Sequence, residues 1–252
     1  MITRAQITKL ASDDGVDAKT VERDYVLTHV AALVARHDTA GSLILKGGTS
    51  LRILHFDNYR YSADLDYSIR HGTYPEALDL FRGALARAKL ESITKLHLVD
   101  DTGGCWIHYE GPLRSERSIK LDLSDNELVV NTEPARPIAR WPDVPEAPIL
   151  AYTRLEVTAE KLRCVLQRFQ CRDLLDLDQL LEDGLIPSMP LRSSHERQHT
   201  RISIRSPSQT RSKARSFATR KPGRPSWRST WRIPPISTKS NGACVERSDA
   251  HN

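Results

Sequence analysis

Two aspartates separated by one residue are the first candidates for chemistry in this sequence. Asp64 and Asp66 flank Leu65, and the stretch 64–69 alternates polar and apolar residues as a β-strand does. Residues two apart on a strand project from the same face, so both carboxylates can bind a divalent metal ion while Leu65 faces the core. Such a pair, taken alone, is more often a solvated strand face.

A glycine pair precedes these aspartates. Gly47 and Gly48 follow the short apolar strand 43–45 and open a stretch with helical spacing. Glycine lets the backbone approach phosphate oxygens, a helix start favours anions, and Thr49 or Ser50 can donate hydroxyls. A tight strand-to-helix turn also explains the glycines. Asp64 comes 16 residues after Gly48. Nucleotidyl transfer requires a loop that binds the triphosphate, carboxylates that bind metal ions, and a positioned acceptor hydroxyl. The glycine pair and the aspartates meet the first two requirements.

Asp122 is the candidate for a third metal-binding carboxylate. It lies in the alternating stretch 119–123, which predicts another strand. The alternative, an exposed aspartate on an edge strand, remains open.

The elements around these residues predict a mixed sheet with helices packed against it. Asp17 can cap a helix with an apolar face, and Pro75 opens another. The apolar residues of the first helix are Val21, Tyr25, Val26, Val30 and Leu33. Further strands are predicted at 93–99, 105–110 and 118–123.

A proline-rich run, 134–148, separates the sheet region from a helical one, because prolines remove backbone donors. We interpret it as a linker or an extended wrap. Thr158 can cap a helix over 159–170, and Gly184 can end the next helix. Their predicted apolar faces comprise Leu162, Val165, Leu166 and Phe169, then Leu174, Leu177, Leu180 and Leu181.

The composition changes near Ser188. Residues 189–252 contain 14 Lys and Arg against 3 Asp and Glu, and one leucine, Leu191, whereas the net charge of the whole chain is +5. This segment is predicted to be disordered, because little apolar surface offsets the chain entropy. It is either a solvated basic tail or the product of a shifted reading frame, which resequencing of the gene would decide.

No apolar stretch approaches the roughly 20 residues of a membrane-spanning helix. The start of the chain, Met1 to Arg4, lacks the features of a secretory signal. We therefore expect a cytoplasmic protein.

Four motifs together resemble the nucleotidyltransferase toxins of the AbiEii/AbiGii type, which include the mycobacterial MenT-like toxins. The motif likeness covers roughly residues 1 to 186. The motifs are Glu22-Arg23-Asp24-Tyr25-Val26-Leu27, Leu45-Lys46-Gly47-Gly48-Thr49-Ser50-Leu51, Arg60-Tyr61-Ser62-Ala63-Asp64-Leu65-Asp66, and Glu160-Lys161-Leu162 followed by Arg172-Asp173-Leu174-Leu175-Asp176-Leu177.

This resemblance implies an α+β (mixed α/β) fold with a DNA polymerase β-like nucleotidyltransferase core. The expected division is a core at 1–133, a linker at 134–150, a helical region completing the site at 151–187 and a basic tail at 188–252. The implied activity is Mg²⁺-dependent transfer of a nucleoside monophosphate from NTP to an acceptor such as the 3′ end of tRNA. A cognate antitoxin would restrain this toxin, as a toxin–antitoxin or abortive-infection component.

The resemblance also assigns roles. Gly48 and Ser50 would contact the triphosphate, Asp64 and Asp66 would bind Mg²⁺, and Lys161 would neutralise phosphate charge. Asp173 would complete the site, with Asp176 as a rival one turn away. Two other functions stay open: transfer to a small molecule such as an antibiotic, and non-catalytic nucleic-acid binding through the basic tail.

Overall fold

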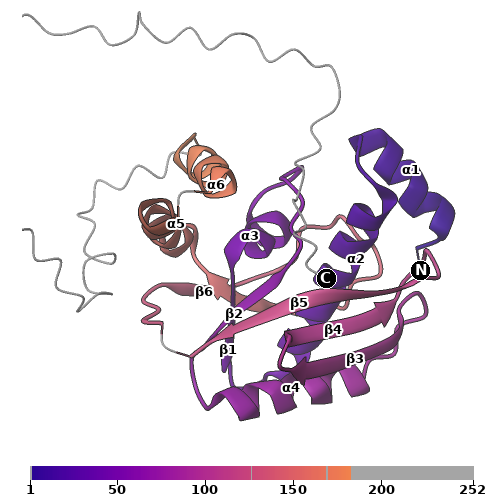
Figure 1. Cartoon of the computed structure of the whole chain (residues 1–252), viewed down its shortest axis with the longest axis horizontal. Helices are drawn as coiled ribbons and strands as arrows, with labels where there is room; N and C mark the ends of the chain where they lie inside the picture. Colours follow the sequence, from indigo (N-terminus) through magenta and orange to yellow (C-terminus); the bar gives the residue numbers. More distant parts are fainter. Residues whose placement is uncertain (1, 126, 169, 183–252) are drawn as a thin grey trace, which may run out of the picture. The chain divides into compact units, whose positions relative to one another are not determined.

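Strands from both halves of the chain form one mixed sheet. The computed structural model describes residues 2–125, 127–168 and 170–182. Within these residues seven strands pair in the order β3-β4-β5-β2-β1-β7-β6 (Figure 1). They are β1 (Leu43–Lys46), β2 (Leu65–Ile69), β3 (Thr94–Asp101), β4 (Gly104–Glu110), β5 (Glu116–Ser124), β6 (Thr132–Ala135) and β7 (Ile149–Tyr152). The mixed α/β class expected from the sequence is confirmed.

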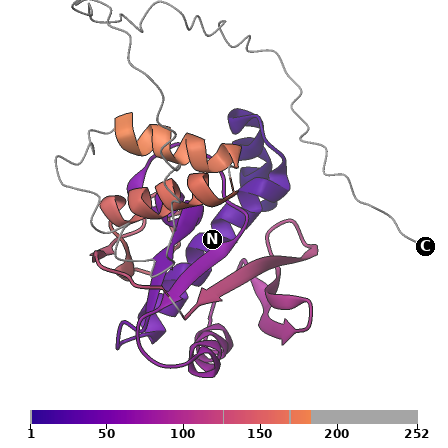
Figure 2. The same ribbon diagram turned by 60° about the vertical axis from the view of Figure 1, so that its left-hand side comes forward.

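The helices of the described residues pack against this sheet. They are α1 (Arg4–Asp14), α2 (Ala18–His37), α3 (Gly47–Ser50), the π-helical turn η1 (Leu51–His55), α4 (Tyr74–Ala86), α5 (Arg154–Arg168) and α6 (Cys171–Glu182). α5 and α6 lie side by side and away from α4 in two views (Figures 1 and 2). The predicted helix stop at Gly184 and the predicted disordered tail lie outside the described residues. No helix in the described part of the chain is long and apolar enough to cross a membrane.

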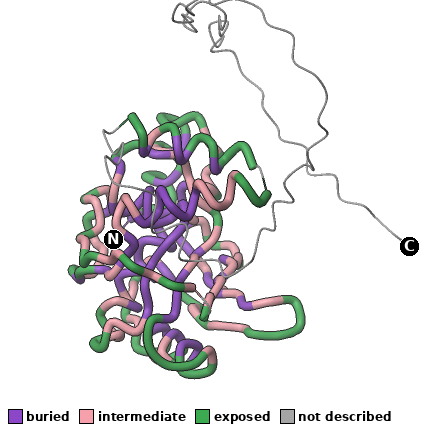
Figure 3. The backbone as a smooth tube through the Cα atoms, turned by 90° about the vertical axis from the view of Figure 1, so that its left-hand side faces the viewer, coloured by how far each residue is buried: buried purple, intermediate pink, exposed green. Residues whose placement is uncertain are grey.

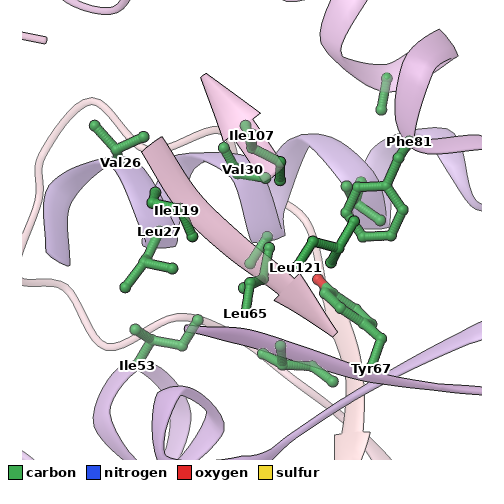
Figure 4. Packing of buried hydrophobic residues seen from close by; sticks show 14 of the residues in the cluster. Val26, Leu27, Val30, Ile53, Leu65, Tyr67, Phe81, Ile107, Ile119 and Leu121 are labelled. Atoms are coloured by element: carbon green, nitrogen blue, oxygen red, sulfur yellow. The ribbon is translucent and has the colours of Figure 1, made fainter. Parts of the chain in front are cut away.

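Strand β1 divides two hydrophobic clusters, because alternate side chains of a strand point to opposite faces. Leu43 and Leu45 belong to the larger cluster, which includes residues of α2 and α4. Ile44 belongs to a smaller cluster with Leu180 of α6. Figure 4 shows the larger cluster, and Figure 3 shows buried residues gathered in the interior. Burial of each such aliphatic side chain contributes roughly 1.5–3 kcal/mol, so β1 is held rigidly from both sides.

The strand register brings the predicted site residues into one row. β1 pairs antiparallel with β2, with Lys46 opposite Asp66. β2 pairs in parallel with β5, with Asp66 opposite Asp122. Leu65 is fully buried in the larger cluster, as the alternating pattern predicted. The central strands therefore place a lysine and two aspartates side by side.

The two ends of the predicted linker at 134–150 lie in strands of the sheet. The first residues of the linker belong to β6, which pairs antiparallel with β7, and β7 pairs in parallel with β1. Pro134 is tolerated because β6 is an edge strand, where one missing backbone donor leaves no neighbour unsatisfied. Only the ends of the predicted linker thus belong to the sheet, and residues 136–148 between them form no strand.

The helix after the linker differs from expectation. α5 begins at Arg154, five residues before the predicted start, and the Thr158 hydroxyl donates to the Arg154 carbonyl instead of capping the helix. Leu166, expected in the core, is 87% exposed, whereas Glu160 and Lys161 are buried. The apolar pattern failed here because α5 buries charged side chains, of which Lys161 is compensated by the ion pairs described below.

Candidate active site

The glycine turn touches the aspartates. Gly47, the first residue of α3, has a φ of +72°, a left-handed conformation that glycine adopts without strain. A Cβ atom placed there would overlap the Asp66 carboxylate. Backbone conformation and close approach both require glycine at this position, so the turn and the aspartate form a single site.

The two hydroxyls after the glycines support the turn. Thr49 Oγ1 donates to the Asp64 carbonyl oxygen at 2.5 Å, and Ser50 Oγ donates to the Gly47 carbonyl oxygen at 2.9 Å. Both residues are fully buried. Both protons are therefore committed to backbone oxygens, and the contact of these hydroxyls with a triphosphate stays a prediction. Thr49 ties the turn to Asp64, the residue that precedes β2.

The pKa of Asp66 reflects both its burial and the charges around it. Burial raises the pKa of Asp66 to about 6; Lys46 opposes this shift, and the negative charges of Asp122 and Asp64 add to it. Asp122 is itself paired with Lys120, whose Nζ lies 2.8 Å from a carboxylate oxygen. Carboxylates that are held close together repel one another, and a bound cation relieves this repulsion.

The helical half contributes a buried ion-pair cluster. Lys161 Nζ lies 3.0 Å from Asp173 and 2.7 Å from Asp176. Arg168 also binds Asp173, at 2.9 Å, and Arg60 binds Asp176, at 2.6 Å. Burial lowers the pKa of Lys161, but the two carboxylates outweigh it and hold this pKa above its ordinary value. Lys161 is thus a fixed positive charge.

Most of these groups line one cavity of about 490 Å³. Of the described residues that line it, seven are basic and five are acidic. The basic ones are Lys46, Arg60, Lys120, Lys161, Arg163, Arg168 and Arg172, and the acidic ones are Asp64, Asp66, Asp122, Glu127 and Glu160. Gly47 and Gly48 also line it, whereas Asp173 and Asp176 lie behind its wall. A glycine turn, aspartates and fixed cations therefore meet at one cavity.

Comparison with known proteins agrees with this arrangement. The family model described as "Nucleotidyl transferase AbiEii toxin, Type IV TA system" matches residues 31–233. The chain belongs to the AbiEii nucleotidyltransferase toxin family. It is therefore a transferase and a toxin of the type IV toxin–antitoxin class. The match extends past residue 186, where the motif likeness ends, so the family likeness continues into the basic segment.

Solved structures similar to this AbiEii protein include the following one. It is described as an antigenic nucleotidyltransferase-like protein from Paracoccidioides brasiliensis, with 15% identity, a TM-score of 0.42, and coverage of 62% of this chain and 75% of that chain. No curated protein matches the chain.

The donor set of the AbiEii site suits a divalent ion shared with a nucleotide. No group of three or more His, Cys, Asp or Glu side chains in the described ranges is arranged to hold a metal ion alone. Mg²⁺ commonly binds one or two carboxylates together with substrate phosphates and water, in place of an all-protein cage. Asp64 and Asp66 beside the glycine turn fit this requirement. The role of Asp122 as a third ligand stays a prediction.

Lys46 is a member of the site that the sequence did not single out. It is 6% exposed, and its Nζ contacts Glu127, lies 3.2 Å from Ser124 Oγ and 3.7 Å from a Glu160 oxygen. Its position directly before Gly47 was the available signal. Burial of a lysine is costly unless it is paired, and Glu127 and Ser124 supply this pairing at the cavity that Lys46 lines.

Proposed function

We propose that this AbiEii protein transfers a nucleoside monophosphate from an NTP to a hydroxyl at the 3′ end of tRNA, with Mg²⁺ as cofactor. The observation that carries the proposal is the contact between the Gly47 turn and the Asp66 carboxylate inside one charged cavity. In this reaction the acceptor hydroxyl oxygen bonds to the α-phosphorus and releases its proton to water, and pyrophosphate leaves with the electron pair of the broken phosphoanhydride bond. The cytoplasm supplies both substrates.

Each group has a distinct task. The backbone at Gly47 and Gly48 approaches the triphosphate, and Asp64 and Asp66 hold Mg²⁺. The bound ion would neutralise charge on the triphosphate and on the transferred phosphoryl group. Lys161 is a fixed cation that stabilises the negative charge on the transferred phosphoryl group. Because its position is already fixed, it needs no reorganisation during the reaction. Asp173 and its rival Asp176 position Lys161.

The rim of the cavity favours a nucleic acid over a small-molecule acceptor. Arg163 and Arg168 on α5 and Arg172 on α6 line one side, and Lys120 on β5 lines the cavity as well. Clustered basic side chains bind phosphate backbones by releasing counterions. A small acceptor would need fewer basic side chains around the cavity. We therefore place the tRNA end across these residues.

A cognate antitoxin is the further partner implied by the family. Expression of the chain should arrest growth, and co-expression of the neighbouring gene product should relieve the arrest. Growth arrest that persists in a variant without transferase activity would contradict the assignment of toxicity to this cavity.

Label transfer tests the reaction directly. Purified protein is incubated with each of four α-labelled NTPs, bulk tRNA and Mg²⁺, and the tRNA is resolved on a gel. Asp64→Asn with Asp66→Asn should lower transfer at least about a hundredfold, since the charge on the reacting phosphate loses its counterion. EDTA should have the same effect. Asp79→Asn is the control, because Asp79 is 74% exposed on α4.

Three outcomes contradict the proposal: transfer by the folded double variant, transfer in EDTA, or labelling of a small molecule in place of tRNA.

A further inference from the structure

Glu160 is a buried carboxylate in the cavity whose role the reaction leaves open. It precedes Lys161 on α5, is 8% exposed, and lines the cavity with Asp64 and Asp66. Its negative charge adds to the raised pKa of Asp66, so the two carboxylates lie within electrostatic reach. Glu160 therefore stands near the place where the transferred phosphoryl group must lie.

Neither oxygen of Glu160 accepts a hydrogen bond from the described residues. Oε1 lies 3.7 Å from Lys46 Nζ and 4.0 Å from Arg163 Nη2, beyond hydrogen-bonding distance. Oε2 is buried and accepts no hydrogen bond from the described residues. Glu127, by contrast, accepts hydrogen bonds from Lys46, from Ser68 at 2.7 Å and from Tyr152 at 3.2 Å.

This contrast indicates what Glu160 can bind. A buried carboxylate oxygen is stabilised by a donor, and its charge repels phosphate. Lys46 is the nearest cation, but it is already held by Glu127 and Ser124. The donors that nucleotide substrates offer are ribose hydroxyls and exocyclic amines. A ribose hydroxyl is the donor that the proposed reaction brings to the α-phosphorus.

We propose that Glu160 accepts a hydrogen bond from a ribose hydroxyl of the acceptor's terminal nucleotide and so positions that nucleotide for attack. This inference rests on the proposed function. The acceptor is favoured over the NTP as the source of the hydroxyl, because the glycine turn and the aspartate pair already anchor the NTP. Glu160 thus binds the acceptor, whereas Asp64 and Asp66 bind the metal ion and the NTP.

Binding measurements test whether the ribose hydroxyl belongs to the acceptor or to the NTP. The full chain is titrated with fluorescent bulk tRNA in Mg²⁺ and a non-hydrolysable NTP analogue, using intact tRNA and tRNA ending in a 2′-deoxy or a 3′-deoxy nucleotide. Wild type should bind the intact end roughly tenfold more tightly than one deoxy end, the effect of one charge-assisted hydrogen bond. Glu160→Ala should bind all three ends equally, with unchanged affinity for the NTP analogue.

Two further variants complete the design. Glu160→Gln keeps the side-chain volume and one acceptor oxygen, so it should retain part of the discrimination and the wild-type melting temperature. Glu182→Gln, at an exposed position of α6, should behave as wild type.

The inference is overturned if Glu160→Ala still discriminates between the ends, or if wild type never does. It is also overturned if the substitution instead abolishes discrimination between ribo- and deoxyribo-NTP analogues. Label transfer by wild type reports on the proposed function separately, so its failure is distinguishable from a failure of the Glu160 inference.

Discussion

Arg60 and Asp176, which lie 116 residues apart, form a two-point ion pair with Nε–Oδ1 at 2.6 Å and Nη2–Oδ2 at 2.7 Å. Tyr59 donates its hydroxyl to the same carboxylate at 2.6 Å. A Cβ atom on Gly48 would lie 2.7 Å from Arg60 Nη2. This pair therefore joins α6 to the glycine turn, and its two parallel hydrogen bonds fix the orientation of the guanidinium at the cavity wall.

Asp176→Asn should destabilise the fold and loosen the turn. Asp176 is fully buried, and removal of one partner of a buried charge pair costs roughly 3 kcal/mol. Urea denaturation measures the loss, with Asp178→Asn at an exposed position of the same helix as the control, expected within about 0.5 kcal/mol of wild type. Equal effects of the two substitutions would show that the Arg60 pair does not stabilise the structure.

Gly47→Ala should abolish nucleotide binding, and Gly15→Ala should not. Both glycines have positive φ, +72° and +66°, so each substitution costs about 1 kcal/mol or more in backbone strain. A Cβ at Gly15 meets nothing within 4 Å, whereas one at Gly47 displaces the Asp66 carboxylate. Thermal stabilisation by Mg²⁺ with a non-hydrolysable NTP measures binding. Retained stabilisation of the Gly47→Ala protein would argue against the site.

Lys161→Met should unfold the helical half more readily than Lys120→Met. Lys161 compensates two fully buried aspartates, and an uncompensated buried charge costs about 3–5 kcal/mol. The side chain of Lys120 is 42% exposed, and an exposed pair contributes at most about 1 kcal/mol. Urea denaturation compares the two. Loss of transfer in Lys161 variants therefore reports on catalysis only if folding is measured in the same sample.

The stability of the protein should depend on two buried histidines. Burial lowers the pKa of His29 and of His55 below the ordinary value of 6.5, against the opposing effect of backbone oxygens that bind their rings. A depressed histidine pKa means that the unfolded chain binds more protons as the pH falls below about 6.5, so these residues stabilise the fold above that pH and lose the effect below it.

The comparison of wild type with His55→Gln tests this dependence. The difference in free energy of unfolding between the two proteins should be smaller at pH 5 than at pH 7.5, by at most about 1.4 kcal/mol for each unit of pKa shift. Urea denaturation at both pH values gives the difference. A constant difference would exclude a role for His55 titration.

The sequence by itself determined the elements whose signals are local. Asp17 caps α2 by accepting from the Lys19 N–H at 2.8 Å, as its position before the apolar pattern predicted. The alternation around Leu65 and the glycine pair located β2 and the turn. These features depend on neighbours within a few residues, so residue type and spacing suffice to predict them.

Tertiary structure decided which polar groups are buried and what they bind. Thr49 donates its hydroxyl to the Asp64 carbonyl oxygen, and Lys46 enters the cavity beside Glu127 and Ser124, because partners far away in the sequence accept their protons. α6 buries Asp173 and Asp176, while other residues of the same helix, Leu174 and Leu181, are 41% and 44% exposed. A charged side chain is buried at low cost only where an opposite charge pairs with it. When that partner lies far away in the sequence, no local pattern predicts the pair.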